Sequence, residues 1–452
     1  MTSGGGPGDS GIRLSERVER YHRVLKEIET VHLDGRVSRV VGLLIEGQGP
    51  GATVGSQCLI YPKEGSARPV LTEVVGFRDQ TVLFMPFGET RGIGPGCRIV
   101  ARGDPAGCRV GNELLGRVVN GLGEPIDGRG PLQTKTVYPL YAAPPHPLRR
   151  QRIQRPVDVG IRAINGLLTC GKGQRIGIFS GSGVGKSTML GMVSRFTKAD
   201  ASVIALIGER GREVREFIER DLGEDGLNRS VVVVATSDQP PLVRMRGAFV
   251  ATAIAEFFRD QGMDVLLLMD SLTRFAMAQR EVGLSAGEPP TTKGYPPSVF
   301  AMIPRLLERA GISERQGSIT GLYAVLVESD DFNEPISDAV RSILDGHVQL
   351  SRDLAVRSHY PAIDVLGSVS RLMRDVVEAE HMEKARRFLE ILSIYRGAED
   401  LIQLGAYTRG SDPRVDQAIE CLGPFTRYLR QGIDEPVNLE RSVEELKVLV
   451  PD

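Results

Sequence analysis

A glycine-rich segment between residues 180 and 188 has the residue types needed to hold a phosphate. It follows the apolar run Arg175–Phe179 and precedes a helical pattern that begins at Met189. Glycines let successive backbone N–H groups turn toward an anion, and the start of a helix adds positive partial charge. The segment is therefore predicted to bind nucleotide phosphates through Ser180, Gly181, Ser182, Gly183, Val184, Gly185, Lys186, Ser187 and Thr188.

Two side chains in this loop have expected roles in ATP binding. Lys186 would reach the β- and γ-phosphates, and the Ser187 hydroxyl would ligate Mg²⁺. Ser180 stands where the strict phosphate-loop pattern has glycine, but the later glycines and the Lys-Ser-Thr sequence are intact. The segment is therefore still expected to bind ATP together with Mg²⁺.

Acidic residues follow two further apolar runs. Asp270 ends the run Val265–Met269, where a carboxylate can hold the shell of a Mg²⁺ ion. Glu209 and Glu213 come shortly after a run that ends at Ile207, and a carboxylate there could polarise an attacking water. Spacing alone does not choose between these two glutamates.

The elements that position these residues are continuous apolar runs bounded by polar turns, typical of strands buried on both faces. An α/β fold with a parallel sheet covered by helices is therefore expected between about residues 150 and 375. The runs are Arg175–Phe179, Val203–Ile207, Val231–Ala235, Val265–Met269 and Gly321–Val327.

The regions on either side of this sheet differ in texture. Short β-rich runs between residues 31 and 105, at 39–45, 57–61 and 81–85, predict a small β-barrel or sandwich. After residue 377 the composition indicates a helical domain. Apolar residues from Leu14 to Ile28 recur at helical spacing behind a Gly/Ser/Pro-rich tail. That helix either packs on its own domain or forms a surface for a partner or a membrane.

Composition limits the broad class of the protein. The 452 residues suggest two or three domains, and a net charge of -1 gives no bulk attraction to nucleic acid or anionic lipid. The five scattered cysteines support neither a disulfide framework nor a zinc site. The N-terminus does not have a signal-peptide pattern, and the apolar runs are too short for a membrane span, so a cytoplasmic protein is expected.

Taken together, several segments resemble the family of rotary ATP synthase catalytic subunits, and most closely its protein-export branch of flagellar and type III secretion ATPases. Ser180 fits this branch, in which serine or alanine commonly replaces the first loop glycine. The matching segments are Gly171–Ser187, Gly208–Glu213, Asp270–Ala276, Gly294–Phe300, Leu344–His347, His359–Val365 and Ser368–Arg371. The resemblance implies a partner-binding helix after a disordered tail (1–30), a β-barrel (31–105), a RecA-like P-loop ATPase domain (106–376) and a C-terminal helical domain (377–452).

The resemblance also implies roles for individual residues. Glu209 corresponds to the water-activating carboxylate, and Arg210 to its neighbour on the phosphate side. Asp270 corresponds to a Mg²⁺ ligand that acts through the ion's outer shell. Arg371 corresponds to an arginine that a neighbouring subunit inserts to stabilise the transferring phosphoryl group. Tyr360 corresponds to the aromatic that stacks on adenine, and Tyr407 is expected to flank it from the C-terminal domain.

The function implied is Mg-ATP hydrolysis that energises flagellar protein export, by a cytoplasmic protein held peripherally at the inner membrane. Because one chain carries both the base and the arginine finger, a homohexamer is the economical assembly. Implied partners are the regulator or stator protein FliH at the N-terminal helix, the central stalk protein FliJ, the export gate, and export substrates with their chaperones. The alternatives are an injectisome ATPase, a rotary proton-pump subunit and an RNA translocase.

Overall fold

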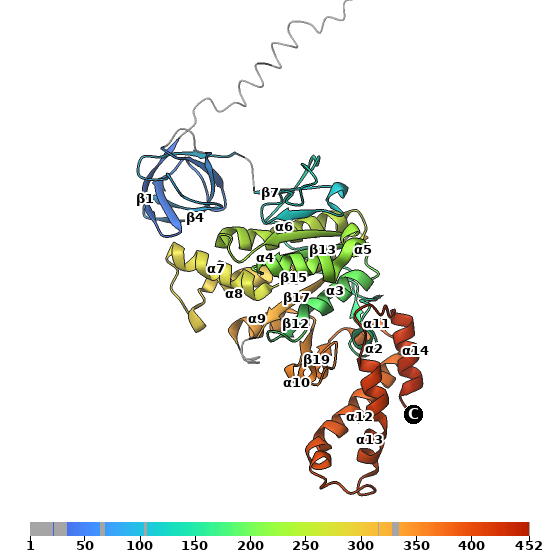
Figure 1. Cartoon of the computed structure of the whole chain (residues 1–452). Coiled ribbons are helices and arrows are strands. Elements are labelled where there is room, and N and C mark those ends of the chain that lie inside the picture. Colours follow the sequence, from blue (N-terminus) through green and yellow to red (C-terminus); the bar gives the residue numbers. More distant parts are fainter. Residues whose placement is uncertain are drawn as a thin grey trace, which may run out of the picture.

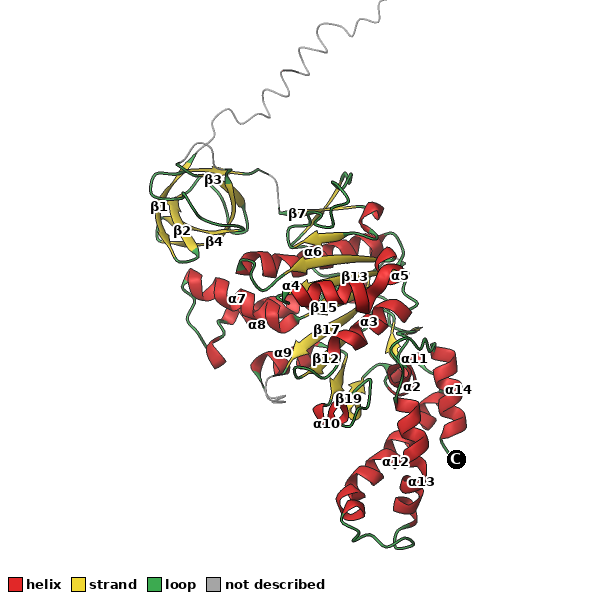
Figure 2. Ribbon diagram, in the orientation of Figure 1, coloured by secondary structure: helices red, strands yellow, loops and turns green. Residues whose placement is uncertain are grey.

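The computed structural model describes residues 21, 34–63, 68–103, 106–314, 316–327 and 334–451. The helix expected from Leu14 to Ile28 therefore lies outside the described residues, apart from Tyr21. Figures 1 and 2 show an all-strand unit at one end of the molecule, a sheet with helices on both faces in the middle, and a helical unit at the other end.

The N-terminal unit is a closed six-stranded barrel, as predicted. Its strand order is β1-β2-β5-β4-β3-β6, and its interior is filled by apolar side chains such as Val37, Ile45 and Ile60. One expected strand is wrong: the run 39–45 is a hairpin, because Gly42 has a φ of 56° and turns the chain between β1 and β2. The strands are β1 Gly35–Val41, β2 Leu44–Gln48, β3 Gln57–Tyr61, β4 Val70–Arg78, β5 Thr81–Pro86 and β6 Arg98–Ala101.

The central sheet has nine strands, and its order along the main path is β19-β18-β12-β17-β15-β13-β14-β8. All five predicted apolar runs form its parallel centre. The predicted parallel sheet is confirmed, and two antiparallel strands extend it: β19 pairs with β18 and β16 pairs with β17. The strands are β8 Val118–Asn120, β12 Arg175–Ser180, β13 Ala201–Ile207, β14 Ser230–Ala235, β15 Asp264–Asp270, β16 Gly311–Ile312, β17 Ser318–Leu326, β18 Gly346–Leu350 and β19 Ile363–Ser370.

Alternate residues of the central strands enter two different cores. Val203 lies in the core that also contains α6, α7, α8 and α9, whereas its neighbour Ile204 lies in the core that contains α2, α3 and the C-terminal helices. Burial on both faces explains why these strands read as unbroken apolar runs. The helices are α2 Arg162–Leu167, α3 Lys186–Phe196, α4 Gly211–Glu216, a π-helical turn Phe217–Leu222, α5 Gly223–Asn228, α6 Pro241–Asp260, α7 Leu272–Ala286, α8 Pro297–Leu307, α9 Pro335–Ile343 and α10 Arg352–Val356.

The C-terminal unit is a long helical hairpin with one further helix packed at its base (Figure 1). The rings of Phe388 and Phe425 stack at 3.9 Å between the two arms of the hairpin. The helices are α11 Met373–Val376, α12 Ala379–Gln403, α13 Pro413–Leu429 and α14 Leu439–Leu449. None of the helices in the described ranges combines the length and apolar character needed to cross a membrane.

Short elements connect these units. Two small antiparallel pairs precede the main ATPase core, and short 3₁₀ turns lie between the longer elements. The pairs are β7 Gly107–Val110 with β9 Thr136–Pro139, and β10 Pro156–Val157 with β11 Cys170–Gly171. The turns are Asn112–Leu114, Pro147–Arg149 and Thr292–Gly294.

A buried ion pair joins the barrel to the ATPase core. Arg246 on α6 and Glu73 on β4 are 4% and 5% exposed, and their side chains approach to 3.3 Å. The Tyr141 hydroxyl donates a hydrogen bond to Glu73 at 3.2 Å. Burial is the main reason that the pKa of Glu73 rises to about 7, against the opposing charge of Arg246.

Candidate active site

The predicted phosphate loop lies at the carboxyl end of β12, between the strand and helix α3. Gly183 and Gly185 have φ angles of 78° and 86°, a left-handed conformation that favours glycine. Ser182, Gly183 and Ser187 are exposed, whereas Ser180 is buried at the end of the strand. This geometry leaves the loop and the first turn of α3 open to a phosphate group.

Lys186 and Asp270 meet at the carboxyl ends of the central strands, although 84 residues separate them in the chain. Asp270 ends β15, and the Lys186 ammonium donates a hydrogen bond to its Oδ1 atom. Both side chains are largely buried, at 11% and 5% exposure. The fold therefore brings the loop lysine and the strand-end carboxylate into one charged cluster.

Glu209 joins the same cluster from the next strand. β13 lies beside β15, and Leu206 pairs with Asp270, so Glu209 follows just beyond the carboxyl end of β13. Burial and the charge of Asp270 raise the pKa of Glu209 to about 7, while Lys186 acts in the opposite direction. A carboxylate with this pKa can take up a proton near neutral pH.

The surroundings of Glu209 distinguish it from Glu213, which spacing alone did not. Glu213 lies one helical turn further on, in α4, and contributes to the raised pKa of Glu209 through a hydrogen bond. Arg210 is 81% exposed and makes a 3.4 Å contact with Glu213. Glu209 thus faces Lys186 and Asp270, whereas Arg210 points to solvent.

The residues present fit a Mg²⁺ ion that is held largely by nucleotide phosphates. Ser187 offers an exposed hydroxyl in the first turn of α3, and Asp270 offers a carboxylate beside Lys186. Mg²⁺ in such sites keeps several waters and takes one or two protein oxygens. The described residues do not include a group of three or more His, Cys, Asp and Glu side chains that could hold a metal alone.

Tyr360 covers the phosphate loop from the other side. A Cβ atom added to Gly185 would lie 3.3 Å from its ring, so the ring rests directly on the loop. Ile363 of β19 pairs with Leu350, which pairs with Ser180, and this register puts Tyr360 at the loop end of the sheet. Tyr360 is 46% exposed, so part of its surface is open to solvent.

Arg371 lies at the end of the sheet opposite to the phosphate loop, near the amino ends of the parallel strands. It follows Ser370, which pairs with Gly346 at the start of β18, and its backbone N–H donates to Asp345 at 3.0 Å. Because β18 is parallel to β12, Arg371 lies near the amino end of β12. A strand of six residues spans about 20 Å, so the exposed Arg371 does not reach the phosphate loop of its own chain.

Tyr407 also lies apart from the loop. It is in the connection between α12 and α13, at the end of the hairpin that points away from the sheet (Figure 1). Its hydroxyl bonds to Asp416 and to the carbonyl of Asp412, both at 3.0 Å. The structure does not place Tyr407 beside Tyr360, because the connection lies at the far end of the hairpin arms.

Sequence reasoning did not single out Arg274, a second cation at this edge of the sheet. A Cβ atom added to Gly208 would lie 2.7 Å from the Cβ of Arg274, so the arginine packs directly against the residue before Glu209. The close approach explains why glycine precedes Glu209. Ser271 caps the start of α7 by accepting from the N–H of Arg274 at 3.3 Å. A serine before a helical pattern is a helix-start signal that could have placed Arg274 in the first turn of α7.

The fold and the site together define a P-loop ATPase with an N-terminal barrel and a C-terminal helical domain. Three family models agree with this class: the ATP synthase alpha/beta nucleotide-binding domain over residues 160–370, the beta-barrel domain of that family over 37–103, and the T3SS EscN ATPase C-terminal domain over 377–448. The chain belongs to the ATP synthase alpha/beta family and is an ATPase of that family.

Relatives that align over nearly the whole chain come from two kinds of export system. The chain is 54% identical to the flagellum-specific ATP synthase of Bacillus subtilis, over 92% of this chain and 94% of that protein. It is 50% identical to the type 3 secretion system ATPase of Xanthomonas euvesicatoria, over 92% and 94%. Assembled EscN from enteropathogenic E. coli, solved in complex with its central stalk EscO, is 45% identical with a TM-score of 0.85, over 92% and 100%.

Proposed function

We propose that this chain hydrolyses Mg-ATP to energise protein export through a flagellar type III apparatus. The cluster of Lys186, Asp270 and Glu209 at the phosphate loop carries the hydrolytic part of this proposal. The higher identity to a flagellum-specific relative supports the flagellar system over the injectisome, which is the second candidate.

The residues of this chain would divide the work of hydrolysis. The backbone N–H groups of the loop and the Lys186 ammonium would hold the phosphates. Glu209 would orient the attacking water and accept its proton, for which a pKa near 7 is suited. Ser187 and Asp270 would hold Mg²⁺, and the ion, when bound, neutralises charge on the phosphates. Tyr360 would stack on the adenine, and Arg210 would lie at the exposed phosphate side.

The position of Arg371 supports a site shared between subunits. It lies too far from its own phosphate loop to act there, but it is exposed at the edge strand β19, where a neighbouring copy can pack. A repeated head-to-tail contact of this kind closes into a ring, and we propose a homohexamer. Arg371 of each copy would then complete the site of its neighbour.

The export role also implies the partners. The solved complex of EscN with its central stalk supports a stalk protein of the FliJ type in the centre of the ring. The N-terminal segment 1–30 would bind a FliH-type regulator. The export gate, with substrates and chaperones, would be met at the inner membrane, where the protein would be held peripherally.

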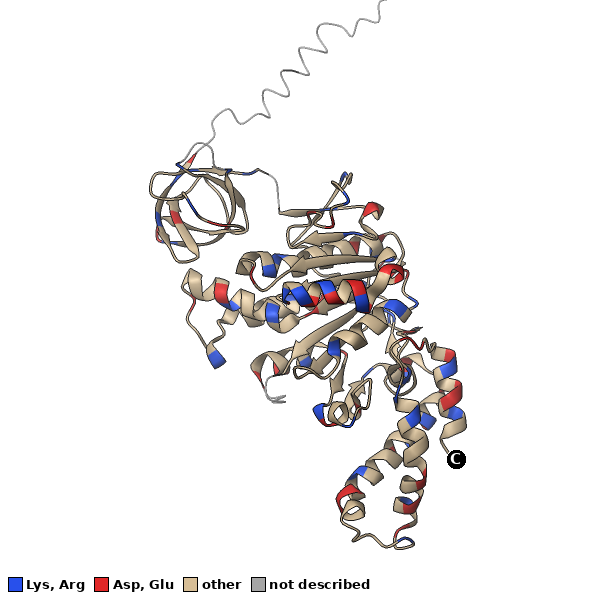
Figure 3. Cartoon of the chain, in the orientation of Figure 1, with Lys and Arg blue, Asp and Glu red and all other residues tan. Residues whose placement is uncertain are grey.

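Other functions of this fold receive less support. An RNA translocase would need a basic barrel face with several exposed aromatics, but two of the four barrel aromatics, Phe84 and Phe87, are buried. Tyr61 and Phe77 are exposed, at 39% and 51%. In Figure 3, basic and acidic positions are interspersed along the described elements. A proton-pump subunit is disfavoured by the match of the C-terminal domain to the EscN model.

One experiment tests the proposed function directly. Lys186→Ala is introduced into the chromosomal gene, and culture supernatants are probed for hook and filament proteins. We expect these proteins to disappear from the supernatant while intracellular amounts persist. Loss of secreted effectors with normal flagella would favour the injectisome. Stimulation of the purified ATPase by RNA would instead contradict the export function.

A further inference from the structure

Gln431, in the connection between α13 and α14, is buried, and both polar atoms of its side-chain amide are hydrogen-bonded. It is 6% exposed. Its Oε1 accepts from the N–H of Arg162 at 2.7 Å, and its Nε2 donates to the carbonyls of Gly160 and Glu435, both at 2.8 Å. Its own backbone N–H donates to the carbonyl of Tyr360 at 3.0 Å. One residue of the C-terminal domain thus joins Tyr360 to the start of α2.

The connection between α13 and α14 also contacts α3, the helix that follows the phosphate loop. Arg195, near the end of α3, donates to Asp434 at 2.9 Å and to the carbonyl of Ile433 at 2.8 Å. Gly160, which Gln431 bonds, packs against the last residue of α3, because a Cβ added there would lie 2.2 Å from the Cβ of Phe196. Residues 430–438 therefore contact the far end of α3, while Tyr360 covers its beginning.

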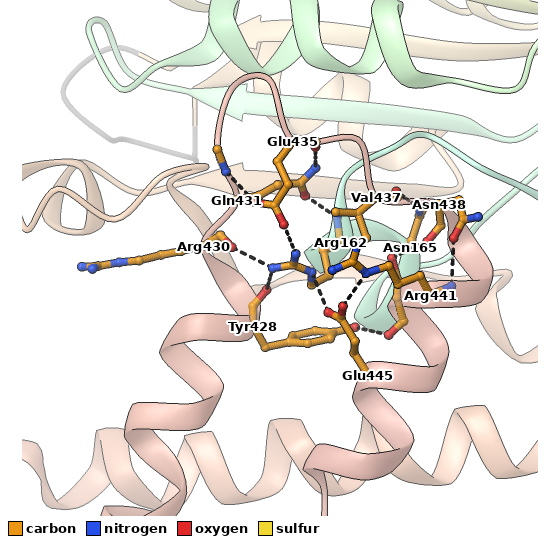
Figure 4. A network of polar contacts seen from close by, with 12 residues as sticks. Arg162, Asn165, Tyr428, Arg430, Gln431, Glu435, Val437, Asn438, Arg441 and Glu445 are labelled. Atoms are coloured by element: carbon orange, nitrogen blue, oxygen red, sulfur yellow. Dashed lines mark hydrogen bonds and ion pairs between the residues drawn. The ribbon is translucent and has the colours of Figure 1, made fainter.

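Figure 4 shows how the ends of this connection are fixed around Arg162. The Arg162 side chain is 8% exposed and donates to the carbonyls of Arg430 at 2.9 Å and Tyr428 at 3.3 Å. It also pairs with Glu435 and, at 3.0 Å, with Glu445 on α14. Gln431 directly follows Arg430, so these contacts of Arg162 restrain the backbone N–H that donates to the Tyr360 carbonyl.

We propose that Gln431 is a positioning residue for the base of the nucleotide. It fixes the backbone of Tyr360, and thereby the ring that rests on Gly185, without touching the nucleotide. The proposal rests on the adenine-stacking role proposed above for Tyr360. Because a half-exposed ring must be ordered before it can stack, a fixed backbone lowers the entropy that binding costs. Base recognition would then depend on the C-terminal domain.

The test compares Gln431→Met, which keeps the side-chain length and removes the amide, with Gln403→Met as the matched control. Gln403 is exposed at the end of α12, where its Nε2 donates to Glu399 at 3.1 Å. For Gln431→Met we expect the KM for ATP to rise about fivefold with kcat within about twofold, because uniform binding is lost. The preference for ATP over GTP should fall. A reduced kcat with an unchanged KM would overturn the proposal.

Tyr360→Ala and the double variant separate this proposal from the role of Tyr360 itself. If Gln431 acts through Tyr360, the Gln431→Met change should have no further effect on KM in the Tyr360→Ala background. Additive effects would show that Gln431 acts elsewhere and would overturn only its positioning role. A Tyr360→Ala variant with normal KM for ATP would overturn the stacking role and this proposal together.

Hydrogen exchange on the unaltered full-length protein keeps the proposal testable if Gln431→Met does not fold. Mg²⁺ with adenylyl imidodiphosphate is the probe. We expect the backbone amide of Gln431, which bonds Tyr360, to exchange more slowly when this nucleotide is bound, while amides around Gln403 keep their rate. An unchanged rate at Gln431 under saturating nucleotide would overturn the proposal.

Discussion

Glu209 and Asp270 are carboxylates at the carboxyl ends of adjacent parallel strands, and burial together with the charge of Asp270 raises the pKa of Glu209 to about 7. Lys186, which donates to Asp270, limits this rise. The pair thus separates two roles: one carboxylate is tied to the loop lysine, and the other is poised to exchange a proton near neutral pH.

This pKa predicts the pH dependence of turnover. A base must be unprotonated to accept a proton, so kcat/KM for ATP should increase as pH rises through about 7 and level off above it. Initial rates measured from pH 5.5 to 9 with saturating Mg²⁺ test this. A profile that is flat across neutral pH would show that Glu209 does not act as the base.

Glu209→Gln should separate binding from chemistry. Since a general base contributes about 10²–10⁴ in rate, we expect hydrolysis to fall by at least about a hundredfold, while a fluorescent ATP analogue still binds. Lys186→Ala should also abolish turnover. Glu216→Gln is the matched control, because Glu216 lies further along α4, pairs with Arg212 and has 56% of its side chain exposed, so this variant should retain most activity. Normal hydrolysis by Glu209→Gln would refute the assignment.

Mixing two inactive chains tests the shared site. Arg371→Ala keeps an intact phosphate loop, and Lys186→Ala keeps an intact Arg371, so activity should reappear when the two are mixed and reassembled. In a random equal mixture about a quarter of the interfaces would hold both intact halves. If Arg371 acted within its own chain, every mixture would stay inactive. Mixing wild type with Arg371→Ala should also depress activity more than dilution does.

Arg246→Met should destabilise the junction between the barrel and the ATPase core. Removing one partner of a buried pair typically costs about 3–5 kcal/mol, because Glu73 would remain buried and unpaired. The folded protein holds the Glu73 proton more tightly than the unfolded chain, with a pKa of about 7 against 4.5, so the free energy of unfolding falls as pH rises between these values. Without Arg246 this fall should extend to higher pH.

Thermal unfolding at pH 6 and pH 8 measures this effect. The destabilisation by Arg246→Met should be larger at pH 8. Arg39→Met serves as the control, since Arg39 pairs with Glu46 at the surface, with 62% of its side chain exposed, and it should change the midpoint far less. Equal destabilisation at the two pH values would mean that Glu73 stays charged without Arg246.

Removal of residues 1–30 should weaken binding of a FliH-type regulator and leave the fold intact. The first strand of the barrel begins at Gly35, so every strand of the described barrel is retained. Circular dichroism checks the fold, and co-purification with the regulator checks binding. If the truncated chain unfolds, the segment packs on its own domain, which is the alternative that its helical pattern left open.

Local sequence patterns were sufficient to predict the elements whose residues all have the same surroundings or lie next to one another in the chain. The five central strands could be predicted because both faces are buried, and the phosphate loop because its glycines and lysine are contiguous. The edge strand β19 and the hairpin at Gly42 were not predicted. Each depends on a turn or on a neighbour that is distant in sequence, and periodicity does not contain that information.

The sequence by itself determined the phosphate-binding chemistry, because Gly183, Gly185, Lys186 and Ser187 are neighbours in the chain. It also indicated carboxylates at the ends of two strands. Only the tertiary structure decided that Glu209, rather than Glu213, faces Lys186 and Asp270, since strand order sets which ends are adjacent. It also decided that Tyr360 rests on the loop and that Arg371 and Tyr407 do not, because distances across a sheet or along a hairpin depend on how the elements pack.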